Sequence, residues 1–147
     1  MIQIRPARES EARRIRKMVR SARLNPVDLN WRNFVVACDE EGVVRGCGQV
    51  KHHRDGSKEL ASLVVEDGWR RQGIAGRIIQ AIQTNEPPPL WLTCRSELIP
   101  YYQQFGFSES TNPDDMPSYF RRVHCLVGFF LRTTRSGDYL GVMCWNG

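Results

Sequence analysis

The sequence has no apolar run long enough to span a membrane. The longest run, residues 123–131, is interrupted by His124 and Gly128 and falls well short of the ~20 apolar residues of a spanning helix. The N-terminus also lacks the leading apolar stretch of a signal peptide. These absences predict a soluble protein with no membrane partner.

Disulfide and metal-binding patterns are missing too. The five cysteines are odd in number and form no C-x-x-C pair, so we expect neither a disulfide framework nor a zinc site. Most of them lie in apolar segments, where cysteine packs as a small hydrophobic residue. Unpaired cysteines favour a reducing compartment, and we therefore expect the protein in the cytoplasm.

The 147 residues contain no internal repeat and no low-complexity segment, which predicts a single domain over residues 1–147. Charge is distributed unevenly, because residues 1–33 carry nine basic and three acidic side chains. We interpret the basic helix predicted there as a solvated face, and the alternatives are a patch for adenosine phosphates, an acidic partner, or nucleic acid. No aromatic residues alternate with the arginines of this helix, which argues against nucleic acid as a partner.

Hydrophobic periodicity predicts strands that alternate with helices, hence an α/β (α+β) fold. We expect helices at residues 9–22, 74–84, 96–105 and 118–132, with a short helical turn at 28–31. We expect strands at residues 2–5, 34–38, 43–51, 58–65, 90–94 and 139–145, and a further strand that starts at residue 107. Turns are expected at residues 40–42, 54–57 and 135–138.

One turn combines glycine with positive charge. The apolar run at residues 60–65 is typical of a buried strand, and the isoleucines after residue 73 recur with helical spacing. The first amides of a helix have no internal partner and carry partial positive charge, so the turn between these elements fits a phosphate or pyrophosphate. The three-glycine dinucleotide fingerprint and the G-K-[ST] of the P-loop are both absent. The turn reads Arg70-Arg71-Gln72-Gly73-Ile74-Ala75-Gly76-Arg77.

The pattern R-x-x-G-x-A directly after a strand resembles the pyrophosphate-binding motif of the GNAT superfamily of N-acetyltransferases. About 30 residues downstream, residues 100–107 read P-Y-Y-Q-Q-F-G-F, which is similar to the aromatic-Tyr-x-x-x-Gly-Phe pattern of the same superfamily. The resemblance covers the element order from Ile2 to about Ser110. It implies a single-domain GNAT-like fold, with a mixed, mostly antiparallel central sheet that is splayed at the cofactor site and flanked by helices.

The resemblance also implies acetyl-coenzyme A as co-substrate, and we expect no metal. The strand end would offer backbone amides to the thioester, the glycine turn would hold the pyrophosphate, and Ser96 would contact the pantetheine arm. Arg95 stands where the family commonly has asparagine, which puts the usual contact to that arm in doubt. The expected cofactor-binding residues are Leu63, Val64, Val65, Arg70, Arg71, Gln72, Gly73, Ile74, Ala75, Gly76, Arg77 and Ser96.

Acyl transfer to an amine needs an acid for the leaving thiolate and a base for the ammonium. The resemblance places Tyr102 at the family's general-acid position, and a phenol with an ordinary pKa of about 10 is protonated at neutral pH. Glu59, on the central strand, is the candidate catalytic base and would act through water. The three histidines, His52, His53 and His124, remain alternatives as the base.

The connection over residues 111–138 is long for a compact domain, and its aromatic residues predict an ordered, functional segment. In the family's fold it would cover the acceptor, so Tyr119 and Phe120 are the expected substrate-binding residues. We predict an acetyl-coenzyme A-dependent N-acyltransferase, an N-acetyltransferase, acting on a small amine or amino-acid-like acceptor. The alternatives are a protein N-terminus or lysine as acceptor, a non-catalytic acyl-coenzyme A sensor, and a basic nucleic-acid-binding module. The sequence leaves monomer and homodimer both open.

Overall fold

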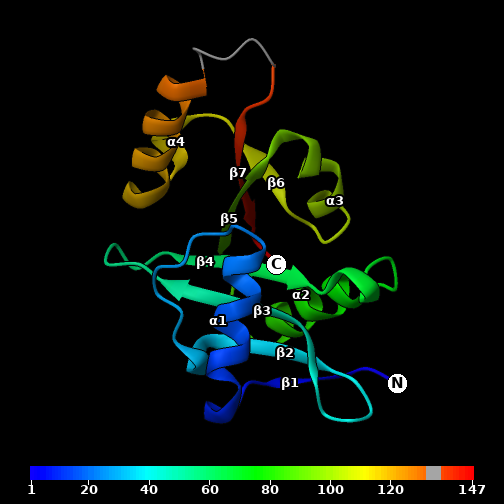
Figure 1. Ribbon diagram of the computed structural model, residues 1–147. Coiled ribbons are helices and arrows are strands. Elements are labelled where there is room, and N and C mark those ends of the chain that lie inside the picture. The colour runs from blue at the N-terminus through cyan, green and yellow to red at the C-terminus, as the bar shows by residue number, and fades with distance from the viewer. Residues whose placement is uncertain (132–136) are drawn as a thin grey trace. The chain divides into compact units, whose positions relative to one another are not determined.

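The computed structural model describes residues 1–131 and 137–147, with side chains for 1–127 and 137–147 (Figure 1). It contains a seven-stranded, mostly antiparallel sheet flanked by helices, with strand order β1-β2-β3-β4-β5-β7-β6. The chain forms two compact units. The first comprises Met1–Lys51 and Leu60–Glu86, and the second comprises His52–Glu59 and Pro87–Gly147.

The first unit is built around antiparallel strands. Its helix α1 (Ala12–Ser21) turns Ile15, Met18 and Val19 inward, where they form one hydrophobic cluster with strand residues such as Val36. This is the inner face that the helical periodicity predicts, apart from Ala12, which is only half-buried. The strands are β1 (Gln3–Pro6), β2 (Phe34–Cys38), β3 (Val44–His52) and the larger part of β4 (Lys58–Val65).

Helix α2 (Ile74–Asn85) packs on the other face of this unit's strands. It buries four isoleucines at helical spacing, and Ile78 lies over Gly48 of β3. A Cβ atom at Gly48 would stand 2.9 Å from the Ile78 Cγ2 atom, closer than real side-chain atoms come, so only glycine allows this approach. The glycines that weaken β3 as a strand therefore admit α2 close to the sheet.

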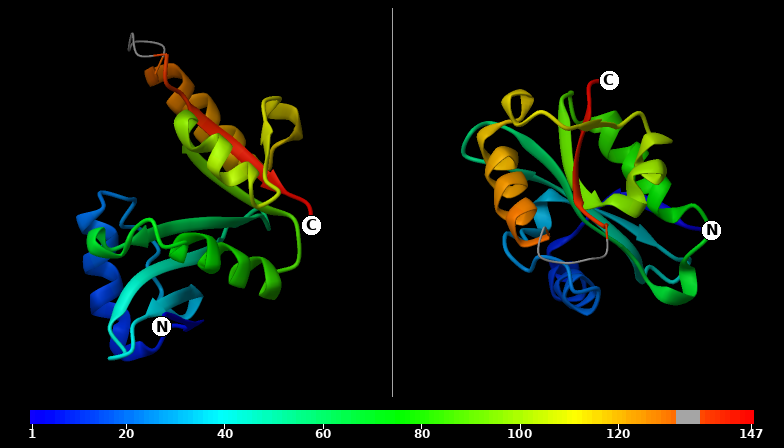
Figure 2. Two further views of the ribbon diagram at one scale, coloured as in Figure 1. Left: turned by 90° about the vertical axis from the view of Figure 1, so that its right-hand side faces the viewer. Right: turned by 90° about the horizontal axis from the view of Figure 1, so that it is seen from above.

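The second unit has its own core between two helices. Helix α4 (Ser118–Leu131) inserts Phe120 into a cluster with Trp91 and Val142. Helix α3 (Ile99–Gln103) lies on the opposite face of β7, because Ile99 packs against Gly141, the neighbour of Val142 (Figure 2). The strands of this unit are β5 (Leu90–Arg95), β6 (Ser108–Ser110) and β7 (Leu140–Trp145), with β7 antiparallel to both others.

Several helices and turns begin or end at residues other than those predicted from the sequence. The helical turn expected at 28–31 is a 3-10 turn at Trp31–Asn33, because the Asn30 side chain accepts from the Arg32 amide and starts the turn later. The helix expected at 96–105 is a 3-10 turn, Ser96–Leu98, followed by the five residues of α3. Arg132, the expected last residue of the fourth helix, and the first half of the turn at 135–138 lie outside the described residues.

Candidate functional site

The glycine turn forms an open helix N-terminus. Gly73 is the N-cap of α2 and adopts the left-handed conformation, with φ of 76°, and no side chain caps the helix. Arg71 is also left-handed, with φ of 64°. Nothing lies within 4 Å of the position that a Gly73 Cβ atom would occupy. The first amides of α2 thus have no side-chain cap and the turn before them has free space, and an uncapped helix N-terminus is suited to phosphate groups.

The three arginines of this turn differ in their contacts. The Nε of Arg70 donates to the Val65 carbonyl oxygen at 3.1 Å, and its guanidinium forms an ion pair with Asp67. Arg77 donates to the carbonyl oxygen of Ile2 at 3.0 Å. Arg71 is exposed and has no polar side-chain partner in the described part of the chain. Arg70 thus connects the turn to β4 and Arg77 connects α2 to Ile2, just before β1, whereas the Arg71 side chain is uncommitted among the described residues.

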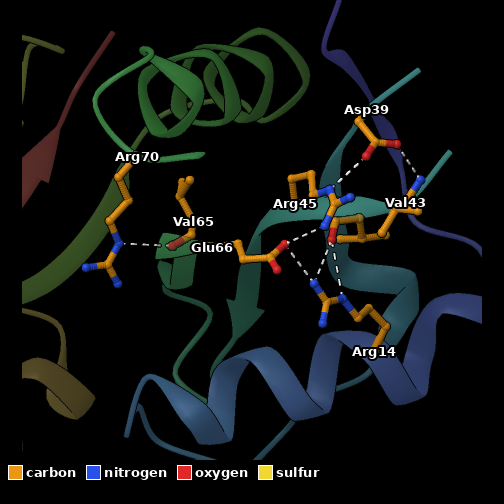
Figure 3. A network of polar contacts seen from close by, with 8 residues as sticks. Arg14, Asp39, Val43, Arg45, Val65, Glu66 and Arg70 are labelled. Carbon is orange, nitrogen blue, oxygen red and sulfur yellow. Dashed lines mark hydrogen bonds and ion pairs between the residues drawn. The ribbon is translucent and has the colours of Figure 1, made fainter. Parts of the chain in front are cut away.

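A polar network fixes the end of β4, which carries Leu63, Val64 and Val65 (Figure 3). The Glu66 carboxylate accepts from Arg14 at 2.9 Å and from Arg45 at 3.0 Å. Arg45 also donates to Asp39 at 2.8 Å. The Val43 amide, and after it Arg45, lower the pKa of Asp39 below its ordinary value. This network anchors the strand just before the glycine turn.

The basic residues of α1 differ in whether they belong to this network. Arg14 is ion-paired with Glu66 and donates to the Val44 carbonyl oxygen. Arg13, Arg16 and Arg20 are exposed and have no polar side-chain partner among the residues that the structure describes. A cavity of about 230 Å³ lies beside the helix, lined by Lys17, Met18 and Ser21 together with the last residues of β4. Sequence reasoning did not find this cavity, because its walls come from segments more than 40 positions apart.

Two unfavourable features meet in the middle of β4. Ser62 is a non-glycine residue with φ of 55°, inside an otherwise extended strand. Its hydroxyl accepts a 2.8 Å hydrogen bond from the Gln49 side chain, which is fully buried, and Gln49 Oε1 has no partner among the described residues. A left-handed residue in a strand changes the direction of the backbone amides and carbonyl groups that follow it, here those of Leu63 to Val65. Nothing in the residue type of Ser62 predicts this conformation.

Tyr102 lies on α3 in the second unit and is half-buried. Its ring packs edge-on against Tyr101 at 5.3 Å and Phe107 at 6.1 Å, measured between ring centroids. Burial raises the pKa of Tyr102 well above that of a free phenol, with smaller contributions from Cys94 and Tyr101. The hydroxyl has no hydrogen bond within the described residues. Tyr102 is thus a protonated donor over the whole neutral range.

Glu59 is paired with a histidine side chain. It is buried, with 8% of its surface exposed, and its Oε1 lies 2.9 Å from Nε2 of His53. The tight turn over residues 54–57 brings these two residues of the second unit together, since the His53 amide donates to the Ser57 carbonyl oxygen. We expected Glu59 to act through water, with His53 as a separate alternative, whereas the structure pairs them. The Asp-Gly signal at 55–56 was the clue, because a hairpin places the residues that flank it opposite each other.

Tyr119 and Phe120 begin α4 beside this pair. The Tyr119 ring stacks on the His53 ring with centroids 3.6 Å apart, and its amide donates to Asp55 at 2.9 Å. Phe120 is fully buried and stacks on Trp91. Of these two residues only Tyr119 is partly exposed, and the buried Phe120 ring packs edge-on against the rings of Tyr119 and His53.

The predicted residues thus fall into two groups. The first unit carries the strand end and the glycine turn, and the second carries Tyr102, Glu59, Tyr119 and Phe120. Ser96, also in the second unit, accepts a hydrogen bond from the Tyr139 amide at 3.3 Å, and Arg95 lies 3.6 Å from Glu97. Within the described residues, no cluster of His, Cys, Asp and Glu could hold a metal ion. No helix in the described segments is long and apolar enough to cross a bilayer.

Several solved structures share this fold. N-acetylglutamate synthase from Neisseria gonorrhoeae, complexed with coenzyme A and N-acetyl-glutamate, superposes with a TM-score of 0.72 at 14% identity over 99% of this chain. The chain spans about a third (35%) of that protein's length. Rv2747 from Mycobacterium tuberculosis, in complex with CoA and NLQ, gives 0.69 at 18% identity and covers 97% of this chain and 98% of its own. Escherichia coli ElaA gives 0.70 at 12% identity, with 99% of both chains covered.

At these identities the structures establish the fold, and the sequence establishes the family. Among curated proteins, no sequence matches the chain significantly. A model of the GNAT acetyltransferase domain matches residues 30–109, which include β2 to β5, the start of β6, the glycine turn and Tyr102. Because this match spans more than half of the chain, the protein belongs to the GNAT family of acetyltransferases.

Proposed function

We propose that this protein is an N-acetyltransferase that moves the acetyl group of acetyl-coenzyme A to the primary amine of a small, amino-acid-like acceptor. The observation that carries the proposal is the open N-terminus of α2 behind left-handed Gly73. Helix amides without a cap, in a turn with free space and an unengaged arginine, are suited to a pyrophosphate. That group is the most highly charged part of coenzyme A.

Binding of the pyrophosphate and the thioester is assigned to residues of the first unit, and one further contact to Ser96 of the second. The amides of Ile74, Ala75 and Gly76 and the side chain of Arg71 would hold the pyrophosphate. The remaining residues of the turn, Arg70, Gln72 and Arg77, would shape it, and Ser96 would reach the pantetheine arm. The amides of Leu63 to Val65 would donate to the thioester carbonyl, where a preorganised donor is worth about 3–4 kcal/mol to the transition state.

The proton for the departing thiolate is assigned to Tyr102. The phenol is protonated at neutral pH, and its hydroxyl is uncommitted among the described residues. A proton donor of this kind contributes roughly 10²–10⁴ to the rate. Tyr101, its neighbour on α3, packs against Phe105 and has no assigned step.

The small acceptor is supported by two of the similar structures. N-acetylglutamate synthase is complexed with N-acetyl-glutamate, and Rv2747 is complexed with NLQ. We assign the contact with the acceptor to Tyr119, with Phe120 as its support, and place the enzyme in the cytoplasm as a single functional domain. A protein N-terminus or lysine is the alternative acceptor.

The test is a screen of amines for release of free thiol from acetyl-coenzyme A. The panel contains amino acids, polyamines, a peptide with a free N-terminus and one with an internal lysine. We expect turnover with an amino acid or small amine and less with the peptides. Binding of acetyl-coenzyme A, seen as a rise in Tm, without thiol release from any amine would identify a sensor and refute the enzymatic proposal.

A further inference from the structure

We infer that His53, and not Glu59, takes the proton from the acceptor's ammonium, and that Glu59 orients and stabilises the imidazole. This inference rests on the proposed function, because it names the base for that reaction. It is carried by the position of His53 between a buried carboxylate and an aromatic wall in the second unit.

The carboxylate fixes the position of the proton on the ring. The side chains of His53 and Glu59 are only 13% and 10% exposed, and Nε2 and Oε1 are 2.9 Å apart. An ionised carboxylate only accepts hydrogen bonds, so the bond requires the proton on Nε2. The lone pair of a neutral ring is then on Nδ1, which has no hydrogen-bond partner in the described part of the chain. Nδ1 is the atom that can accept a proton.

The aromatic wall fixes the plane of the ring. Tyr119 stacks on it at 3.6 Å with an interplanar angle of 15°, and Phe120 meets it edge-on at 5.8 Å. The backbone of His53 is held as well, since its amide donates to Ser57 and its carbonyl oxygen accepts from Gly56. A ring fixed on one face, along one edge and at its backbone is preorganised for proton transfer in one direction.

The chemistry favours the imidazole over the carboxylate. A neutral imidazole is intrinsically a stronger base than a carboxylate. Bases with a pKa near the working pH are the most effective. Glu59 on β4 and Asp55 in the turn both place negative charge near the ring, and from α4 the ring of Tyr119, a titratable phenol, stacks on it. The imidazolium formed in the reaction would therefore be stabilised.

The protons balance as follows. The acceptor's R-NH₃⁺ gives one proton to Nδ1 of His53, and the free amine attacks the thioester carbon. The C–S bond then breaks, the sulfur takes a proton from Tyr102, and Tyr102 regains one from the nitrogen of the adduct. The products are the N-acetyl amide and free coenzyme A, and the His53 imidazolium returns its proton to solvent. No metal or redox partner is needed for these steps.

Two measurements on the full chain test the inference. The first is the tautomer of His53 from ¹⁵N–¹H correlation spectra of the three histidines, assigned with His53→Gln. We expect the Nε2-protonated form in the wild type and its loss in Glu59→Leu, which removes the acceptor. The second is the pH dependence of thiol release for His53→Gln, Glu59→Gln and the control His52→Gln. His52 is adjacent in sequence, exposed, and outside the pair.

We expect His53→Gln to lower kcat by roughly 10²–10⁴ and to abolish the acidic limb of the pH profile, with KM for acetyl-coenzyme A within a few-fold. Glu59→Gln should be less severe and keep that limb, and His52→Gln should match the wild type. Equal activity of His53→Gln and wild type, or a larger loss in Glu59→Gln, overturns the inference and returns the base to Glu59. An Nδ1-protonated His53 also overturns it. No thiol release from the wild type with any amine refutes the proposed function itself.

Discussion

Replacement of Phe120 by alanine should destabilise the second unit without a direct effect on the acceptor. The side chain is fully buried, stacks on Trp91 at 5.6 Å, and meets the rings of His53 and Tyr119 edge-on. Truncation of a buried phenylalanine costs about 3–5 kcal/mol, from lost burial and from the cavity that remains. That is a large part of the ~5–15 kcal/mol by which domains are stable.

The expected change is large enough to measure simply. For a domain of this size each kcal/mol lowers Tm by roughly 2–4 °C, so Phe120→Ala should melt about 6–20 °C below the wild type. Thermal unfolding followed by circular dichroism is the assay. Phe120→Leu keeps most of the volume and should lose less. Leu126→Ala is the matched control on the same helix, because Leu126 is 63% exposed and its truncation should cost little.

The outcome also bears on the acceptor. If Phe120→Ala melts within about 2 °C of the wild type, this cluster does not hold α4 in place and the reasoning fails. If it melts as expected, any change in its acceptor KM reports the loss of support for Tyr119 and His53. Tyr119 is then the residue at which to test acceptor contact, by replacement with leucine.

Three further predictions concern the cofactor, the acid and pH. Gly73→Val places a β-branched side chain at φ of 76° and should abolish the rise in Tm that acetyl-coenzyme A causes. The fold should survive, because nothing packs at that position. A rise in Tm equal to that of the wild type would show that the pyrophosphate binds elsewhere. Tyr102→Phe should lower kcat by roughly 10²–10⁴ with unchanged affinity for the cofactor, whereas Tyr101→Phe should lower kcat only slightly. Equal losses of kcat in the two variants would show that Tyr102 is not the general acid. The Ser57 hydroxyl, and next the Tyr119 amide, lower the pKa of Asp55 to about 2. The ionised Asp55 therefore stabilises the folded protein fully above the ordinary aspartate pKa of about 3.9, and this contribution is lost as the pH falls through 2. Melting between pH 2 and 5 should therefore depend less on pH in Asp55→Asn than in the wild type, and parallel curves would contradict this.

Local patterns predicted several strands and the glycine turn before α2 well. The limits of β2 and β4 agree with the prediction to the residue, because each is an apolar run bounded by turn residues. The start of α2 at Ile74 and the left-handed Gly73 before it follow from a glycine placed between a strand and a helical repeat. These features depend on neighbours within a few positions, and such neighbours are visible in a sequence.

Other features depend on register and packing, which only the folded chain decides. Arg13 and Arg14 are adjacent and chemically identical, yet α1 turns only Arg14 toward Glu66, 52 positions away. Ser62 is an ordinary strand residue by type, and its φ of 55° arises where it meets the buried side chain of Gln49. His53 and Glu59 are two unremarkable titratable residues until the hairpin register sets their side chains 2.9 Å apart and α4 covers the ring. A shift of one residue in that register would turn Glu59 to the other face of the sheet, because side chains alternate along a strand.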